Sequence, residues 1–266
     1  MSFLIVIPAR YASTRYPGKP LVELRGAGGT AKSLIRRSWE AAMAVPGNPR
    51  VVVATDDDRI REAAEAFGAE VVMTAITCAN GTERCAEAYQ TLGETFDVVV
   101  NLQGDAPLTP AWFVDELVTA LRADPTSQVA TPVLRCDGAA VNAFLEDRRN
   151  GRVGGTTAVF GAGNKALYFS KEVIPYTGQT FADDDLTPVF HHVGCYAYRP
   201  EALVEYPTWS AGALEDLEGL EQLRFMEREQ PVLCVEVDGK GRAFWELNNP
   251  SDVERIEMML AQMGAD

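Results

Sequence analysis

The chain has 266 residues, and its 38 acidic against 24 basic side chains give a formal net charge of −14, which disfavours nonspecific binding to nucleic acid or to an anionic membrane. Its five cysteines show no CxxC or zinc-ligand spacing, which predicts reduced thiols in a cytoplasmic protein. The chain shows neither the charged start of an export signal nor an apolar run of about 18 residues, so we expect no membrane span.

The first half of the chain alternates between strand-like and helix-like segments. Residues 3–7 form an apolar run typical of a buried strand, which Pro8 is expected to end. Thr30 is expected to cap a helix that runs to Met43. Further strands are expected at 51–54, 70–73 and 97–102, with helices over 56–67 and 82–93. These repeated βαβ units predict an α/β fold with a doubly wound, mainly parallel sheet in residues 1–130.

The pattern changes after about residue 125. Residues 137–164 are rich in glycine, asparagine and charge, and 152–155 reads as a loop or an edge hairpin. The remaining predicted elements are strands at 166–169, 192–198 and 231–237, an amphipathic helix at 214–226 and a closing helix at 250–263. Residues 131–266 are therefore expected to form a smaller mixed lobe that returns to the core.

Three cations lie in the segment that follows the first strand. Residues 8–19 read PARYASTRYPGK and contain Arg10, Arg15 and Lys19 in an otherwise acidic protein. Loops at the carboxyl ends of strands in an open α/β sheet are where phosphate-bearing ligands bind. The segment therefore predicts an anion site; the alternative is a solvated basic loop.

Asp105 follows the fourth predicted strand in a tight Gln-Gly-Asp turn. In a parallel sheet this turn lies at the same edge as the basic loop. A carboxylate facing a phosphate-binding loop is the usual protein ligand of Mg²⁺, whose other ligands are water and substrate phosphates. We therefore expect Asp105 to hold Mg²⁺; the alternative is an ordinary turn aspartate.

Residues 80–84, with the sequence NGTER, form a third candidate. Gly81 allows a close backbone approach, and Thr82 is suited to cap the following helix. Arg84 lies in the first turn, where its charge opposes the helix dipole, so an anionic or base-edge ligand would explain it. A purely structural cap is the alternative.

The stretches PARYASTRYPGKPL, NGTER, NLQGDAP, ALYFSK, HHVGCYAYR and LEGLEQLR occur in this order. In order and spacing they resemble the 3-deoxy-D-manno-octulosonate (Kdo) cytidylyltransferases, over nearly the whole chain. The resemblance implies a nucleotide-diphospho-sugar transferase-like fold. It also implies a magnesium-dependent reaction of CTP with Kdo that gives CMP-Kdo and pyrophosphate for lipopolysaccharide or capsule synthesis, and a homodimer.

The resemblance also implies roles for individual residues. Lys19, Arg10 and Asp105 would be catalytic, because the reaction depends on positioning and on neutralising phosphate charge. The nucleotide would be bound by Pro8, Ala9, Arg10, Ser13, Arg15, Lys19, Asn80, Gly81, Thr82 and Arg84. The acidic sugar would be bound by Gln103, His192, Tyr196, Glu221 and Gln222. Mg²⁺ would be held by Asp105 and Asn248.

The chain also departs from the family pattern. Asn248 stands where the family has a second metal-binding aspartate, and Cys78 where it has histidine. Residues 156–159 lack the family's lysine, and 174–179 lack its arginine. Two alternatives therefore stay open: a cytidylyltransferase for a different acidic acceptor, and a nucleotide-binding homologue whose catalysis is weak or lost.

Overall fold

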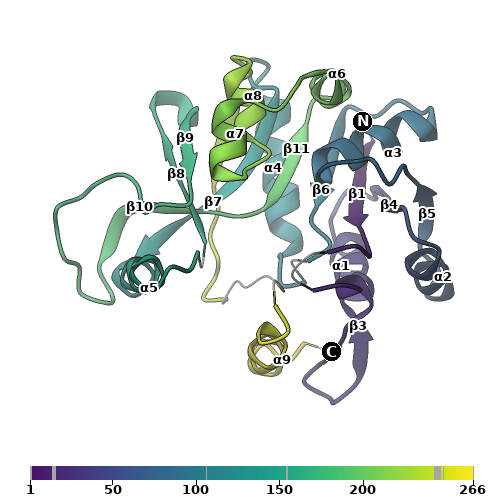
Figure 1. The fold of residues 1–266 in the computed structure, drawn as a ribbon, viewed down its shortest axis with the longest axis horizontal. Coiled ribbons are helices and arrows are strands. Elements are labelled where there is room, and N and C mark those ends of the chain that lie inside the picture. The colour runs from purple at the N-terminus through teal and green to yellow at the C-terminus, as the bar shows by residue number, and fades with distance from the viewer. Residues whose placement is uncertain are drawn as a thin grey trace. The chain divides into compact units, whose positions relative to one another are not determined.

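The computed structural model describes residues 2–13, 16–105, 107–153, 155–242, 247 and 249–265. Contacts divide the chain into two compact units made of interleaved segments (Figure 1). The first unit comprises Met1–Asp115, Tyr198–Pro207 and Gly239–Asp266. The second comprises Glu116–Ala197 and Thr208–Asp238. The chain thus enters the second unit near residue 115, whereas the sequence pattern changes nearer to 130.

A parallel sheet forms the centre of the first unit. Its strands lie in the order β5 (Glu70–Met73), β4 (Arg50–Thr55), β1 (Phe3–Ala9), β6 (Val98–Leu102), and every pair is parallel. The connecting helices are α1 (Leu34–Met43), α2 (Asp58–Ala66) and α3 (Gly81–Leu92). The chain moves outward from β1 to β5 and then crosses back to β6. Right-handed crossovers therefore place α1 and α2 on one face and α3 on the other, which confirms the doubly wound fold.

The reversal of strand order between β1 and β6 creates a topological switch point, the place where open α/β sheets bind ligands. The side chains of Leu4 to Ile7 in β1 are fully buried, so the central strand is rigidly held. A second core lies beneath a small hairpin of β2 (Glu23–Arg25) and β3 (Ala31–Ser33), on which α9 (Asp252–Gln262) packs. Its buried members are Leu24, Leu34, Leu108, Leu247, Ile256 and Leu260.

The second unit contains a mixed sheet. β10 (Leu186–His192) pairs antiparallel with β7 (Val129–Asp137) and β8 (Thr156–Phe160), and β9 (Ala166–Ser170) pairs antiparallel with β8. β12 (Val232–Glu236) joins β7 in parallel, and β11 (Cys195–Tyr198) is a further neighbour of β7. Its helices are α5 (Gly138–Arg149), α7 (Ala213–Glu218), α8 (Leu223–Glu227) and the short η2 (Ala162–Asn164). The short helix η1 (Lys19–Leu21) and α6 (Pro200–Glu205) belong to the first unit, and α4 (Ala111–Ala123) and η3 (Tyr206–Thr208) span the boundaries between the units. The mixed character expected of the smaller lobe is confirmed.

Three local expectations are wrong, and one helix was not foreseen. Pro8 lies inside β1, opposite Ala54; the register with β6 ends at Val6, so the missing N–H breaks no ladder bond on that side. Residues 31–33 form a strand, so α1 begins at Leu34 rather than after Thr30. The charged, glycine-containing stretch after residue 137 includes a helix, α5, which Asp137 caps through Ala140 N.

The expected amphipathic helix over 214–226 is in fact two short helices. Gly219 takes a left-handed conformation at φ 61°, which ends α7 before α8 begins. As a consequence Leu217 is exposed, while Leu223 and Phe225 are buried. The break matters because it creates the turn that carries Glu221 and Gln222.

All five cysteines have free thiols. Burial raises the pKa of Cys195 and of Cys234 to about 12, so both thiols stay protonated. In the part of the chain that the structure describes, no helix combines the length and apolar character needed to cross a membrane.

Candidate active site

The basic loop and the Gln-Gly-Asp turn meet at the switch point of the first unit. Lys19 Nζ donates to Asp105 Oδ2 at 2.7 Å, and the two side chains are 13% and 26% exposed. Gly104 makes this approach possible, since a Cβ atom there would lie 2.8 Å from the carbonyl oxygen of Pro8. The structure therefore places two of the three expected catalytic residues in contact.

Backbone geometry fixes the position of Lys19. Gly18 has φ 71° and precedes the short helix η1, which begins at Lys19. The carbonyl oxygen of Tyr11 accepts hydrogen bonds from Gly18 N and Ser13 N, both at 2.9 Å, and so closes the loop at its base. Arg10 is exposed at the end of β1, while Arg15 lies outside the described residues.

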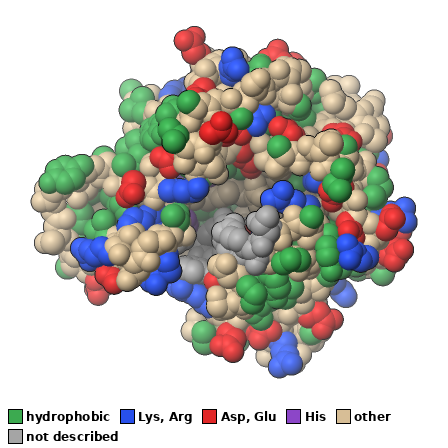
Figure 2. All heavy atoms as spheres, in the orientation of Figure 1, with side chains coloured by type: hydrophobic (Ala, Val, Ile, Leu, Met, Phe, Trp, Pro, Cys, Tyr) green, Lys and Arg blue, Asp and Glu red, His purple; other side chains and the backbone are tan. Residues whose placement is uncertain are grey.

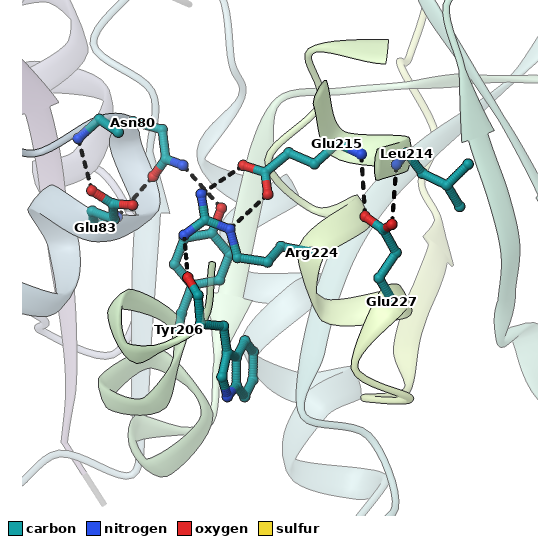
Figure 3. Close-up of polar contacts among 9 residues, drawn as sticks. Asn80, Glu83, Tyr206, Leu214, Glu215, Arg224 and Glu227 are labelled. Atoms are coloured by element: carbon teal, nitrogen blue, oxygen red, sulfur yellow. Dashed lines mark hydrogen bonds and ion pairs between the residues drawn. The ribbon is translucent and has the colours of Figure 1, made fainter. Parts of the chain in front are cut away.

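Asn80, rather than Thr82, caps α3. Its Oδ1 accepts from Glu83 N at 2.9 Å while Glu83 Oε2 accepts from Ala79 N at 2.7 Å, a reciprocal arrangement shown in Figure 3. Asn80 Nδ2 donates to the hydroxyl of Tyr206 at 2.9 Å, which anchors the cap to η3. The helix start is thus held firmly without help from a ligand.

Gly81 brings this helix start against the other two motifs. A Cβ atom there would lie 3.3 Å from Gln103 Nε2, 3.2 Å from Asn101 Nδ2 and 3.5 Å from Pro8 Cγ. Three motifs that are distant in sequence therefore meet in space. The close approach explains the need for glycine within NGTER.

Thr82 and Arg84 are buried inside the first unit. The hydroxyl of Thr82 lies 2.9 Å from that of Tyr198. Arg84 is 3% exposed and donates to Thr74 Oγ1 at 2.5 Å and to Asp56 Oδ2 at 3.1 Å. In this structure Arg84 ties α3 to the chain beyond β4 and β5, and its contact with a ligand remains a prediction.

Asn101 is a residue that the motif analysis missed. It is fully buried in β6, and neither its amide nitrogen nor its amide oxygen has a hydrogen-bond partner among the described residues. An unpartnered buried amide is costly, so its presence beside Gly81 needs an explanation. The sequence did contain a sign of this residue, because Asn101 is the single polar residue in the apolar run VVVNL at 98–102.

The second unit gathers His192, Tyr196 and Gln222. Thr131 donates to the carbonyl of Cys195 at 2.9 Å and therefore accepts from His192 Nε2 at 2.9 Å, while His192 Nδ1 accepts from Thr156 Oγ1 at 3.1 Å. Burial lowers the pKa of His192 to about 3, with His191 contributing, so the ring is neutral. Both ring nitrogens are thus engaged by threonine hydroxyls, and a contact of His192 with a sugar stays a prediction.

Tyr196 and Gln222 form a second buried pair. The Tyr196 hydroxyl donates to Gln222 Oε1 at 3.1 Å, and the His192 and Tyr196 rings lie 5.6 Å apart. Gln222 Nε2 is buried and has no partner among the described residues, which leaves its two N–H groups for a ligand. Glu221 is the preceding residue and partly buried; Gln103, the fifth expected sugar-binding residue, belongs to the first unit.

A buried ion pair holds the turn that carries Gln222 (Figure 3). Arg224 donates to both carboxylate oxygens of Glu215, at 2.6 and 2.7 Å, and also to the carbonyl of Trp209 at 3.3 Å. Glu227 accepts from the backbone N–H groups of Leu214 and Glu215 at the start of α7. These contacts lock α7 and α8 together on either side of Gly219.

Two departures from the family pattern are accommodated by internal contacts. Cys78 Sγ donates to Glu87 Oε2 at 3.0 Å, and the pKa of this thiol is raised to about 12 by burial and by Glu87. Thr157, in the stretch without the family's lysine, donates to the carbonyl of Glu172 at 2.6 Å and accepts from Ile174 N at 3.1 Å. Asn248 lies outside the described residues.

Charge at the surface is mixed, and the described residues hold no preformed metal cluster. Figure 2 shows acidic and basic side chains intermixed over the face that it draws. Within the described ranges, no group of three or more histidine, cysteine, aspartate or glutamate side chains is placed to hold a metal ion. Asp105 supplies a single carboxylate, which fits Mg²⁺ only where a ligand brings further oxygens.

Comparison with known proteins places this site in a family. The family profile described as "Cytidylyltransferase" matches residues 4–232. The chain belongs to this family. Among curated relatives, the 3-deoxy-manno-octulosonate cytidylyltransferase of Maricaulis maris is 44% identical over 264 residues, which cover 99% of each chain. The Chlamydia pneumoniae protein of the same name is 38% identical and covers 96% of this chain and 92% of the relative.

The cytidylyltransferase also matches solved structures. A CMP:2-keto-3-deoxy-manno-octonic acid synthetase complexed with CTP superposes with a TM-score of 0.82 and 32% identity, over 99% of this chain and 100% of that chain. A cytidylyltransferase from Leptospira borgpetersenii, at 18% identity and a TM-score of 0.59 over 97% of this chain and 85% of that chain, shares the fold. The expected fold class and family are confirmed, and the protein is a nucleotidyltransferase.

Proposed function

We propose that this cytidylyltransferase transfers the cytidylyl group of CTP to 3-deoxy-D-manno-octulosonate, giving CMP-Kdo and pyrophosphate. The observation that carries the proposal is the contact between Lys19 and Asp105 at the switch point, next to Gly81 and Gln103. A cation and a carboxylate at that point suit a nucleoside triphosphate. The names of these relatives support a cytidylyl donor and Kdo as the two substrates.

The reaction requires charge neutralisation more than covalent chemistry. The anomeric hydroxyl gives up its proton to water as its oxygen attacks the α-phosphorus in line, the bond from that phosphorus to the bridging oxygen breaks, and pyrophosphate takes the electron pair. Lys19 exchanges Asp105 for the α-phosphate and neutralises the charge that grows there, with Arg10 and Arg15 on the remaining phosphates. We assign the nucleoside side to Pro8, Ala9, Ser13, Asn80, Gly81, Thr82 and Arg84.

Mg²⁺ fits the donor set once CTP is present. Asp105 would hold it through its carboxylate, with Asn248 as a neutral second ligand, and when bound it would neutralise phosphate charge. One carboxylate is too few to hold Mg²⁺ in the free protein. We therefore expect negligible Mg²⁺ binding without CTP, and we expect Asn248→Asp to tighten the metal in the CTP complex, both measured by calorimetry.

The acceptor contacts are proposed for His192, Tyr196, Glu221 and Gln222, with Gln103 from the first unit. Neutral donors and acceptors of this kind recognise sugar hydroxyls, since a hydroxyl left unpaired in a closed site is costly. A different acidic acceptor is the second candidate, favoured by the absence of the family's lysine at 156–159 and of its arginine at 174–179.

A pyrophosphate-release assay with CTP, Mg²⁺ and a panel of acidic sugars tests both candidates. We expect Kdo to give the highest kcat/KM; a faster nonulosonic acid would select the second candidate, and no release with any acceptor would overturn the proposal. Calorimetry with CTP, UTP, ATP and GTP tests base choice, where equal or tighter binding of a purine nucleotide contradicts it. We also propose a cytoplasmic homodimer that serves lipopolysaccharide or capsule synthesis; light scattering in solution measures the oligomeric state.

A further inference from the structure

An arginine on α2 contacts the base of the loop that leads to Lys19. The guanidinium carbon of Arg59 lies 3.3 Å from the centroid of the Tyr11 ring. This distance corresponds to direct stacking of a cation on an aromatic face. Arg59 lies outside all the sequence motifs that indicated nucleotide binding.

Asp57 fixes the orientation of that guanidinium. Arg59 Nε donates to Asp57 Oδ1 at 2.9 Å and Nη2 donates to Oδ2 at 2.6 Å, a two-point contact that leaves the guanidinium plane little freedom. Asp57 is itself held, because it caps α2 by accepting from Arg59 N at 3.0 Å. The cation over Tyr11 is therefore attached to a rigid helix start.

Tyr11 also contacts Gly18. A Cβ atom at Gly18 would lie 3.1 Å from Cε2 and Cζ of the Tyr11 ring, so ring and backbone are in close contact. The carbonyl of Tyr11 also accepts from Gly18 N at 2.9 Å. Lys19, the residue that meets Asp105, follows directly in the chain.

We propose that Arg59 is a positioning residue for nucleotide binding: with Asp57 it clamps Tyr11 against Gly18 and so holds Lys19 where it meets the phosphates. The proposal rests on the proposed function only in naming the nucleotide, because the clamp itself belongs to the free protein. Arg59 touches no reacting group and acts through Tyr11. When the clamp is lost, the backbone at Gly18 and Lys19 can leave this position. Nucleotide binding then weakens because a smaller fraction of the molecules holds Lys19 in place.

The chain offers a matched control on the same helix. Arg61 pairs with Asp58 at 3.2 Å, so Arg61→Ala removes the same charge and the same kind of surface ion pair from α2. Two conservative changes separate the parts of the clamp. Arg59→Lys keeps a cation above the ring but loses the fork to Asp57, whereas Tyr11→Phe keeps the ring.

Hydrogen exchange of the free protein tests the clamp first. We expect Arg59→Ala to speed exchange of the Ser13 and Gly18 amides by about two- to fivefold, the range that an exposed cation–aromatic contact implies. Arg61→Ala and Tyr11→Phe should leave both amides at the wild-type rate, and Arg59→Lys should lie between. Equal exchange in Arg59→Ala and Arg61→Ala would overturn the proposal.

CTP titration by calorimetry then tests positioning. Arg59→Ala should raise the Kd for CTP, by at most about the two- to fivefold factor expected for exchange because the Kd follows only the closed fraction, with Arg61→Ala unchanged and Arg59→Lys partly restored. Faster exchange without a change in Kd would show a clamp that positions nothing, and would also overturn the inference. Failure of the wild type to release pyrophosphate would count against the proposed function alone, because neither measurement uses the reaction.

Discussion

In the first unit the candidate residues stand on loops at strand ends, and three glycines set the distances between them: Gly18 before Lys19, Gly81 at the start of α3, and Gly104 before Asp105. In the second unit the candidates His192 and Tyr196 lie on strands and Gln222 lies on the turn before α8, and buried side-chain hydrogen bonds set their positions. Backbone contacts therefore position the candidates of the first unit, whereas side-chain hydrogen bonds position those of the second.

The difference indicates how each region tolerates change. Close backbone contacts leave no room for a methyl group, so the first unit should be sensitive to small additions. Polar networks are satisfied by several combinations of side chains, provided that no buried group loses its partner. Acceptor recognition in the second unit should therefore vary more readily than nucleotide binding, in agreement with departures such as Thr157.

The largest expected effect is on the buried ion pair of the second unit. Arg224→Ala leaves the Glu215 carboxylate buried without its partner, so we expect the unfolding free energy to fall by about 3–5 kcal/mol in urea denaturation. Arg135→Ala, which breaks the exposed pair with Glu236, is the matched control and should cost about 1 kcal/mol or less. Equal losses would show that the α7–α8 turn does not depend on its buried pair.

Lys19→Ala tests the chemistry of the first unit. We expect kcat for pyrophosphate release to fall by about 100- to 1000-fold, because Lys19 meets charge that develops in the transition state. The Kd for CTP should change far less. Lys32→Ala, which removes a lysine paired with Glu40, should leave both values unchanged. A loss confined to CTP affinity would contradict the assigned role.

Gly104→Ala tests the backbone contact between β1 and β6. The new methyl group would lie 2.8 Å from the Pro8 carbonyl oxygen, which overpacking studies associate with a cost of about 1–3 kcal/mol. We expect weaker CTP binding and a lower midpoint of thermal unfolding. Gly161→Ala places its methyl group at an ordinary 3.6 Å from Leu167 and should be tolerated. If Gly104→Ala bound CTP with wild-type affinity, the turn would have moved to accept the methyl group without any effect on the site.

The smallest effect concerns the pH dependence of the second unit. The pKa of His192 is lowered to about 3, below its unfolded value of about 6.5, so the unfolded chain binds the extra proton first as pH falls. The contribution of His192 to the free energy of unfolding is complete above pH 6.5 and should decline below it, by at most about 1.4 kcal/mol per pH unit. His192→Gln should make the free energy of unfolding, measured by urea titration, depend less steeply on pH between 6 and 5. An unchanged slope would contradict burial of a neutral ring.

The parts of the fold and site that follow local rules could be predicted from sequence. The parallel strands and the meeting of Lys19 with Asp105 follow from apolar runs and from connection rules. The helix over 138–149 could not, because its charged residues carry little apolar periodicity and tertiary contacts stabilise it. Arg84 illustrates the same limit: its unusual helix position was visible, but its partner Asp56 lies 28 residues away in sequence.

The packing of α9 on the β2–β3 hairpin has a consequence for how the protein is made. Leu24 and Leu260 share one small core although they lie near opposite ends of the sequence, and Ala27 N donates to the carbonyl of Ala265 at 2.8 Å. During synthesis the N-terminal strands emerge first, but this core cannot close until α9 has been translated. Such long-range closure is entropically expensive and slow. Capture of the final helix is therefore expected to be a late folding event, which would finish the first unit only after the interleaved second unit has left the ribosome.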